Sequence, residues 1–297
     1  MNARPNSPDG IGPTDRRVAL PRRRKATDLA VRTLCLVATL LALVPLLSLL
    51  RFVIVRGAGG LSWDLLTQLP RPVGEPGGGM ANAIVGTLVL VGLASCIGIP
   101  LGITTGIYLA EYGHTRTARV VRFSADVLSG VPSIIVGMSV YALLVVTMKR
   151  FSALAGGLAL AILMLPTIAR STEELLKLVP NSLREAALAL GVPRWRATLR
   201  VVLRTAAPGI ATGVMLAVAR AAGETAPLLF TALNSRFWPT GLDRPIASLP
   251  VQIFTYAISP YEEWHRQAWA AALVLVTLVL ILNLTARFLV RHGTDGR

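Results

Sequence analysis

Six long runs of apolar residues constrain the fold of this sequence more than any other feature. They lie at approximately 33–55, 83–110, 125–148, 152–170, 207–233 and 268–290. Each has about 19 or more residues, enough for a helix to cross a hydrocarbon core of roughly 30 Å. Transmembrane β-strands alternate apolar and polar residues over about 10 positions, and these runs do not. The sequence therefore predicts an all-α membrane protein with six transmembrane helices.

Composition supports a membrane protein and argues against a soluble one. Of the 297 residues, 53% are hydrophobic and only 15% are charged, whereas soluble domains have about 25% charged residues. The net charge of +15 would suggest nucleic-acid binding in a soluble protein. However, the basic residues lie beside apolar runs, and no basic patch carries the interleaved aromatic residues that stack on bases. We therefore expect no nucleic-acid partner.

The distribution of lysine and arginine predicts that both termini lie in the cytoplasm. With that orientation, the cytoplasmic parts hold 21 of the 30 basic residues, the opposite side holds eight, and Arg220 lies within a span. These cytoplasmic parts are 1–32, 111–122, 170–206 and 287–297. Positive residues concentrate in cytoplasmic loops, so the imbalance favours this orientation. The predicted location is the cytoplasmic (inner) membrane, with multiple passes.

The predicted organisation starts with a disordered basic tail at 1–32 and a first transmembrane helix at 33–55. The 18 uncharged residues from Thr33 to Leu50 exceed the apolar region of a signal peptide, about 7–15 residues, so this span is expected to be retained. An extracytoplasmic loop follows at 56–82. A transmembrane core is assigned to 83–290 with a cytoplasmic loop at 171–206, and a short cytoplasmic tail is assigned to 291–297.

Small residues and aromatic residues suggest where helices pack and where the chain meets the membrane surface. Several glycines recur at four-residue spacing, which lets helix backbones approach closely; they are Gly98, Gly102, Gly106, Gly209 and Gly213. The outer segment 234–267 contains four tryptophan and tyrosine residues that fit an interfacial belt or a docking surface; they are Trp238, Tyr256, Tyr261 and Trp264.

Disulfide and metal chemistry are not expected. The two cysteines, Cys35 and Cys96, lie inside apolar runs and are interpreted as small hydrophobic residues. The three histidines have no ligand-like spacing, so no metal site is predicted. No cofactor is expected on this chain.

The loop at 171–206 is polar and long for a helix connection. Two capping-box patterns, Ser171 with Glu174 and Ser182 with Glu185, predict helix starts. The second should begin a short helix from Leu183 to Leu190, which Gly191 would end. Pro193 suits the first turn of a further helix from Arg194. A helix, a sharp turn and a second helix are therefore predicted on the cytoplasmic face.

Within this loop, Glu185-Ala186-Ala187, three residues, Gly191, nine residues and then Val201 and Leu203 resemble the EAA loop of ABC importer permeases. The sequence departs from that pattern where Val201 replaces isoleucine and Arg204 replaces proline. The resemblance implies that the short helix docks on a separate cytoplasmic ATPase and moves with it. Glu185, Ala186, Ala187 and Gly191 are then the residues that couple transport to ATP hydrolysis, and the fold is that of a type I ABC importer permease.

ATP must be hydrolysed elsewhere. The only lysines are Lys25, Lys149 and Lys177, and none follows a glycine. The glycine-rich phosphate loop of P-loop ATPases, which ends in Gly-Lys-Ser/Thr, is therefore missing from this sequence. The chain is predicted to be a transport subunit and not an enzyme.

Two polar features interrupt the predicted spans. Arg220 and Glu224 are four residues apart in the fifth, so on a helix they would share one face. A charged residue in a span is costly and typically marks a transport pathway, although a self-satisfied ion pair that fixes helix packing is the alternative. In the third, Pro132 should break the helix locally between Ser129 and Ser133, whose hydroxyls either line a polar route or serve only in packing.

These segments together resemble the phosphate-specific ABC importer permeases of the PstA type. The resemblance covers roughly residues 80–290 and is carried by 130–134, 185–195 and 220–229. It implies a heterodimer with a second, similar permease, two copies of a cytoplasmic ATPase and an extracytoplasmic phosphate-binding protein. An intramembrane arginine suits an oxyanion, so Arg220 and Glu224, with Ser129 and Ser133, are the residues expected on the phosphate pathway.

Other functions remain open at this point. Importers of sulfate or molybdate share the loop pattern, and an intramembrane arginine suits any oxyanion. A secondary transporter driven by protons or sodium could use Arg220 and Glu224, but it would not need the cytoplasmic loop. A membrane-embedded enzyme is disfavoured because the sequence has no His/Asp/Glu cluster and no nucleophile motif.

Overall fold

The computed structural model describes residues 22–72, 75 and 77–295, and nearly all of its regular structure is helical. In chain order the elements are α1 (Arg22–Gly60), α2 (Trp63–Thr67), α3 (Ala81–Glu111), α4 (Arg116–Gly130), α5 (Ser133–Val140), the π-helix η1 (Tyr141–Val145), α6 (Val146–Met148), α7 (Ala153–Lys177), α8 (Asn181–Ala189), α9 (Arg194–Ala197), the π-helix η2 (Thr198–Val202), α10 (Leu203–Ala222), α11 (Ala226–Thr231), α12 (Leu249–Ala257) and α13 (Glu262–Asp295). These described residues include no β-strand. The predicted all-α class is confirmed.

The chain divides between Arg51 and Phe52 into two compact units. Within the first unit the structure describes the N-terminal part of α1, whose apolar side chains between Leu29 and Leu50 are exposed. Exposed leucine and valine side chains on a helix this long suit a lipid environment. The helix begins at Arg22, earlier than the predicted span at 33–55. The predicted tail at 1–32 lies mostly outside the described residues.

Among the residues that the structure describes, five helices are long and apolar enough to cross a membrane. They are Thr27–Gly60, Ala81–Glu111, Ala153–Lys177, Arg194–Ala222 and Glu262–Ala286. The bent pair Arg116–Gly130 and Ser133–Met148 gives a sixth span if it is counted as one. The six apolar runs of the sequence therefore all correspond to helical segments, but the third is not a straight span.

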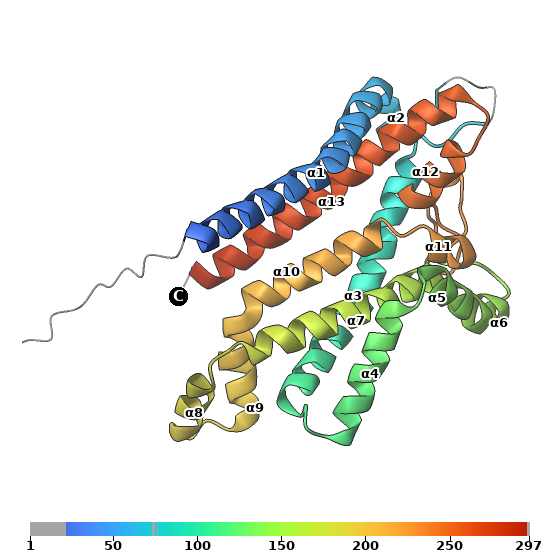
Figure 1. The fold of residues 1–297 in the computed structure, drawn as a ribbon. Helices are drawn as coiled ribbons and strands as arrows, with labels where there is room; N and C mark the ends of the chain where they lie inside the picture. The colour runs from blue at the N-terminus through green and yellow to red at the C-terminus, as the bar shows by residue number, and fades with distance from the viewer. Residues whose placement is uncertain (1–21, 73–74, 76, 296–297) are drawn as a thin grey trace, which may run out of the picture. The chain divides into compact units, whose positions relative to one another are not determined.

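Helix α7 lies at the centre of the second unit and packs on α3 and α10 (Figure 1). The four-residue glycine spacing permits this packing, as predicted. A Cβ atom on Gly102 would lie 2.7 Å from the Cβ of Ile168, and one on Gly106 would lie 2.8 Å from the Cγ2 of Thr172. Gly213 similarly meets Ser171 from the α10 side. The α3 and α10 backbones therefore approach α7 more closely than any larger residue would allow.

Helical structure is interrupted inside two of the predicted spans, and the apolar runs alone do not reveal these breaks. The third predicted span bends by 106° between α4 and α5. Val131 is extended at the break because Pro132 disfavours a helical residue before it and has no N–H to donate. The sequence predicted this local break at Pro132, although it predicted one span over 125–148.

The second break corrects the predicted fifth span at 207–233. Helix α10 ends at Ala222, with Gly223 as its C-cap, and α11 begins only at Ala226. Pro227 lies in the first turn of α11 and cannot donate to the Gly223 carbonyl, so the helix cannot run straight through. Upstream, helical structure extends back through η2 and α9, which makes the observed apolar span Arg194–Ala222.

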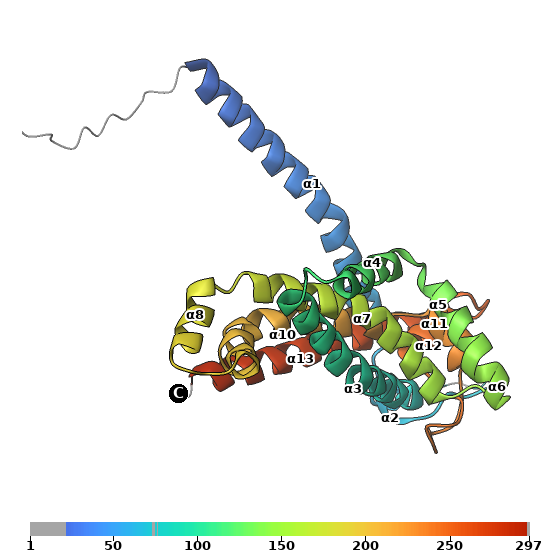
Figure 2. The same cartoon turned by 90° about the horizontal axis from the view of Figure 1, so that it is seen from below.

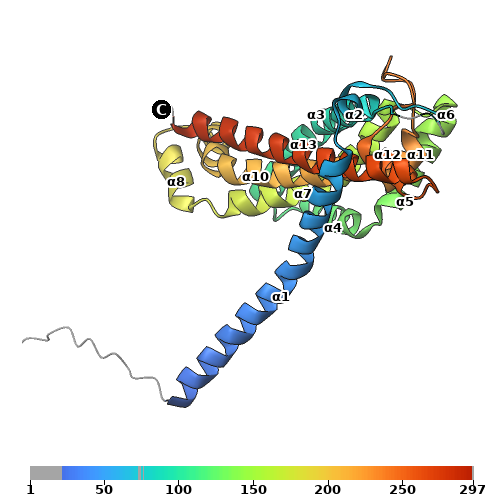
Figure 3. The same cartoon turned by 90° about the horizontal axis from the view of Figure 1, so that it is seen from above.

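The loops of the second unit fall at two opposite ends. Figures 2 and 3 show α8 at one end and α5, α11 and α12 at the other. The end with α11 and α12 contains the predicted extracytoplasmic segment 234–267. One of its four tryptophan and tyrosine residues is not at a surface: Tyr256 is buried and stacks on Trp264, with ring centroids 4.3 Å apart. Tyr256 therefore stabilises the packing of α12 on α13 and is not part of an interfacial belt.

Candidate functional site

Helix α8 carries the predicted coupling motif and is held out at the end of α7 (Figure 2). Glu185 and Ala186 are exposed, while Ala187 is buried. After the helix, the N–H of Val192 donates to the Ala187 carbonyl at 3.1 Å and the N–H of Gly191 donates to the Leu188 carbonyl at 2.9 Å. This pair of bonds forms a Schellman motif, which satisfies the last carbonyls of the helix.

Gly191 is required at this turn by its backbone conformation. Its φ angle is +75°, which residues with a Cβ rarely adopt. No heavy atom lies within 4 Å of the position that a Cβ would take, so backbone strain and not crowding would oppose a larger residue. The prediction that Gly191 ends the helix is confirmed.

Two of the predicted helix starts in this loop need correction. Ser171 caps nothing, because α7 continues to Lys177 and the Ser171 hydroxyl donates to the Thr167 carbonyl at 2.8 Å. Helix α8 begins at Asn181 with Pro180 as its N-cap, so Ser182 is inside the helix. The third predicted start is confirmed, because α9 begins at Arg194 with Pro193 as its N-cap. Prolines set both entry points, because the residue before each helix adopts the extended conformation that a proline ring allows.

The surface around α8 exposes large apolar side chains. Leu190 is 84% exposed and Trp195 is 60% exposed, with Arg196 lying over the Trp195 ring at 5.0 Å. Leu183 and Leu188, on α8 itself, are also exposed. Apolar residues gathered on a short polar loop are typical of a surface that another protein covers.

The second predicted feature, Arg220 with Glu224, is assembled differently from the sequence prediction. Arg220 lies in the last turn of α10, and Glu224 lies in the break after Gly223. Their side chains remain paired, with Arg220 Nε 3.6 Å from Glu224 Oε1. Because Glu224 lies outside α10, the two residues do not share a helix face. Arg220 also lies at the end of its span and not near its middle.

The Arg220 side chain is open to contact from outside this chain. It is 62% exposed, while the Glu224 carboxylate is only 16% exposed. The single contact with Glu224, at 3.6 Å, is made by Nε, so most of the five N–H donors of the guanidinium do not meet this carboxylate. The arrangement can present a positive charge to an anion while the carboxylate holds the guanidinium in place.

The predicted serines lie at the other helix break. The Ser129 hydroxyl donates to the Ala125 carbonyl at 3.0 Å, and Ser133 is the first residue of α5. The helices that follow the two breaks pack together: a Cβ on Gly137 of α5 would lie 2.5 Å from the Cα of Pro227 of α11. The fold therefore places the α4–α5 break and the α10–α11 break near each other, which brings the two predicted polar segments into one region.

Sequence reasoning missed a third group of charges, centred on Glu173 in α7. Glu173 is fully buried, and its carboxylate accepts hydrogen bonds from three cations. Arg122 of α4 donates to Oε1 at 2.6 Å through Nη2 and at 3.0 Å through Nε, and Arg170 donates to Oε2 at 3.0 Å. Lys177 donates to the same carboxylate. We call these four residues the Glu173 cluster.

The Glu173 cluster is a strong link between two helices. Arg170 also pairs with Asp126 of α4 at 3.2 Å, so contacts cross between α4 and α7 twice. A signal existed in the sequence, because Arg170, Glu173 and Lys177 have the i, i+3 and i+4 spacings of neighbours on one helix face. The contribution of Arg122, 51 residues earlier, had no signal.

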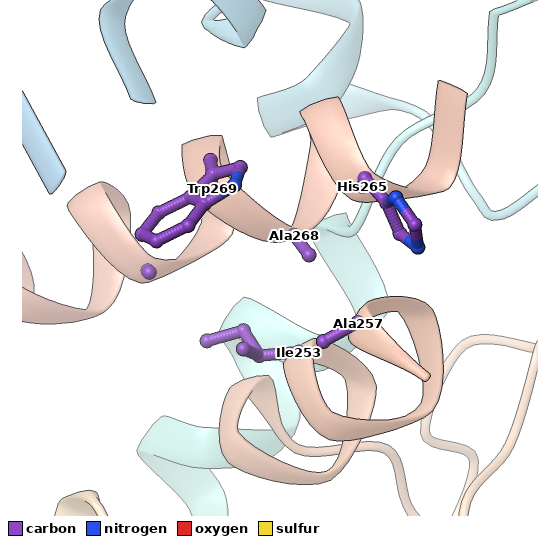
Figure 4. Close-up of a pocket in the computed structure, with 6 residues that line it drawn as sticks. Ile253, Ala257, His265, Ala268 and Trp269 are labelled. Carbon is purple, nitrogen blue, oxygen red and sulfur yellow. The ribbon is translucent and has the colours of Figure 1, made fainter. Parts of the chain in front are cut away.

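A cavity of about 280 Å³ lies between α12 and α13, at the end of the second unit opposite α8. Figure 4 shows Ile253 and Ala257 on one side and His265, Ala268 and Trp269 on the other. His265 Nε2 lies 2.6 Å from the Ser259 carbonyl oxygen. None of the residues that line this cavity carries a permanent positive charge, so its lining does not suit an inorganic anion.

Groups of three or more metal-ligating side chains do not occur in the described part of the chain. The structure therefore offers no candidate metal centre in residues 22–72, 75 and 77–295. Both cysteines in that part, Cys35 and Cys96, are free and exposed.

Comparison with known families decides what kind of protein this is. The family described as "Binding-protein-dependent transport system inner membrane component" matches residues 98–293. The "Phosphate transport system permease protein PstA" of Yersinia pestis is 49% identical over 266 residues, which cover 89% of this chain and 90% of that protein. The chain belongs to the PstA family of membrane permeases. The PstA protein of Haemophilus influenzae is 44% identical over 270 residues, covering 91% of this chain and 95% of that protein.

Solved structures support the same fold for this PstA-family chain. The MetNI methionine ABC transporter matches with a TM-score of 0.56 and 20% identity, over 72% of this chain and 93% of that one. A bacterial alginate ABC transporter matches with a TM-score of 0.64 and 16% identity, over 92% of this chain and 97% of that one. At this identity the likeness concerns the fold alone, and it confirms the predicted type I ABC importer permease architecture.

Proposed function

We propose that this chain is the transmembrane permease subunit of an ATP-binding-cassette importer that translocates inorganic phosphate across the cytoplasmic membrane. The relatives that cover about 90% of the chain are named phosphate transport system permease proteins. The observation that carries the ATP-driven part is α8, a short exposed helix between two spans that ends in the Gly191 turn. Such a helix can be moved by a soluble ATPase that docks on it.

Phosphate transport is supported by the exposed guanidinium of Arg220. A guanidinium presents several N–H donors in a planar fork that matches the oxygens of an oxyanion. Glu224, held 3.6 Å away, orients Arg220 and competes with the anion for it. Ser129 and Ser133 are proposed to add hydroxyl donors along the same route. Weak, exchangeable contacts of this kind let an anion enter and leave a pathway.

The proposed assembly has four further subunits. A second permease completes the pathway, two ATPase subunits dock on the cytoplasmic loops, and an extracytoplasmic phosphate-binding protein delivers the substrate. The chain itself is not an enzyme and binds no cofactor, because its three lysines do not occur in a phosphate loop. ATP is used by the partner subunit. Both termini face the cytoplasm, and the location is the inner membrane.

Uptake by reconstituted vesicles tests the proposal. Vesicles that contain the full complex should accumulate labelled phosphate when ATP is supplied, and a protonophore should not stop them. An ion-coupled transporter would instead lose uptake with the protonophore and would not need ATP. Excess sulfate or molybdate should compete poorly, whereas strong competition would identify a different oxyanion as the substrate.

The docking role of α8 has its own test. Glu185→Lys and Gly191→Val should abolish ATP-driven uptake while the chain still inserts in the membrane. Glu185→Gln and Gly191→Ala are the milder matched variants, and we expect both to retain part of the activity. Normal uptake in both Glu185→Lys and Gly191→Val would remove the support for docking through α8.

A further inference from the structure

Helix α8 cannot hold its own position by apolar packing. Of its nine residues, all within the described part, only Ala187 is buried. Helices this short are marginal in water without tertiary support. The helix packs on α9 and η2, which follow it in the chain. Another link is therefore needed to connect it with the helices that precede it.

Arg184 supplies that link, because its guanidinium contacts two other helices. Its Nη1 donates to the carboxylate of Glu111, the last residue of α3. Its Nη2 donates to the carbonyl of Leu176, in the last turn of α7, at 3.1 Å. The Arg184 side chain is 22% exposed and the Glu111 side chain is 23% exposed, so both ends of the ion pair are largely shielded from water. One side chain thus joins α8 to α3 and α7.

The electrostatics favour an arginine at this junction. The C-terminal ends of α3 and α7 both present partial negative charge, and Glu111 adds a full one. A cation there is stabilised by all three, and a planar guanidinium can reach the carboxylate and the carbonyl at the same time. A lysine at this position would keep the charge but could not present two arms in fixed directions.

The two helices that Arg184 contacts form a stiff pair. Glycines of α3 lie directly against α7 over several turns, and Gly106 meets Thr172 close to the Arg184 junction. A closely packed interface between helices has low compressibility and transmits strain from one helix to the other. A displacement of α8 would therefore be passed to both helices through one guanidinium.

From this geometry we propose that Arg184 is a positioning residue for coupling, which transmits the movement of α8 to the α3–α7 pair. The proposal rests on the function proposed above, in which an ATPase docks on α8. The two-armed link is distinct from the exposed docking residue Glu185, because Arg184 faces the permease and not the partner. Loss of the link should leave the ATPase bound but unable to move the spans.

The first test measures ATPase binding, ATP hydrolysis and transport in the same purified complexes. In Arg184→Ala, we expect a full complement of ATPase subunits, ATP hydrolysis that no longer responds to the loaded binding protein, and at least tenfold slower transport. Arg184→Lys should give an intermediate transport rate, because the ammonium group can still contact one of the two acceptors. Arg119→Ala, which removes an exposed arginine of α4 outside the coupling loop, is the matched control and should behave as the wild type. Wild-type coupling in Arg184→Ala, or loss of the ATPase from the complex, would overturn the proposal.

The second test does not depend on which solute is transported. Spin labels are placed at His114→Cys, just beyond α3, and Leu190→Cys, at the end of α8, in a chain whose Cys35 and Cys96 are replaced by serine. Both labelled positions are exposed. We expect one narrow distance distribution with and without bound nucleotide, and a broad one in Arg184→Ala. An equally narrow distribution in Arg184→Ala would show that other contacts fix α8, whatever the outcome of the phosphate assay.

Discussion

The two groups of charges on the α7 and α10 spans differ in how far the protein neutralises them. The Glu173 carboxylate is fully buried and receives hydrogen bonds from three cations. Arg220 has one partner at 3.6 Å and is 62% exposed. A buried carboxylate with several donors is part of the folded structure, whereas an exposed arginine with a single weak partner can exchange that partner for a ligand. The comparison favours a role in stability for Glu173 and is consistent with our proposal that Arg220 acts in transport.

Glu173→Ala should have the largest effect, and the effect should be on folding. Removal of one partner from a buried ion network leaves the others uncompensated and costs about 3–5 kcal/mol. We expect low yield and a clearly lower unfolding temperature in detergent, since Arg122, Arg170 and Lys177 would repel one another without the carboxylate.

Glu174→Ala is the matched control, because Glu174 is the next residue of α7 and is exposed. We expect its stability to lie within about 0.5 kcal/mol of the wild type. A Glu173→Ala protein that is as stable as the control but transports slowly would mean that the Glu173 cluster belongs to the transport mechanism.

Arg220→Ala should have the next largest effect, and this effect should be on transport. A hydrogen bond to a charged group contributes about 1.5–3 kcal/mol, so loss of one anion contact should slow phosphate uptake by roughly 10- to 100-fold. Stability should change by less than about 1 kcal/mol, because exposed ion pairs contribute little. Arg220→Lys should keep part of the rate.

Uptake and unfolding must be measured on the same Arg220→Ala preparation. If stability falls by as much as in Glu173→Ala while the folded fraction transports normally, the alternative interpretation of Arg220 and Glu224 as a packing pair holds, and the contrast between the two groups disappears.

The sequence predicted the features of this fold that depend on neighbouring residues. All six apolar runs correspond to helical segments, although the bounds of the fifth were wrong and the third is bent, and the glycine spacing of α3 correctly indicated its close packing on another helix. Pro132 and Gly191 each force a local backbone conformation, so their predicted effects are confirmed. Hydropathy alone could not locate the end of α10, because the apolar run resumes at 226–230, directly after the break.

The remaining features depend on contacts between residues far apart in the sequence. Glu173 meets Arg122 across 51 residues, and Arg184 meets Glu111 across 73. Nothing in the local pattern around any of these four residues selects its partner. Ser171 gave a false capping signal because α7 continues past it, with Thr172, Glu173 and Leu176 buried against neighbouring helices. Tertiary burial there overrode a local preference.

Glu224→Gln should have the smallest effect and tests the contrast most finely. The carboxylate competes with phosphate for Arg220, so its removal should make the arginine more available and lower the apparent KM for phosphate. An exposed ion pair contributes up to about 1 kcal/mol, which limits the change to roughly fivefold. The unfolding temperature should stay the same, because the amide oxygen of Gln can still face the guanidinium as an acceptor. A raised KM would instead indicate that Glu224 positions Arg220 for the anion and does not compete with it.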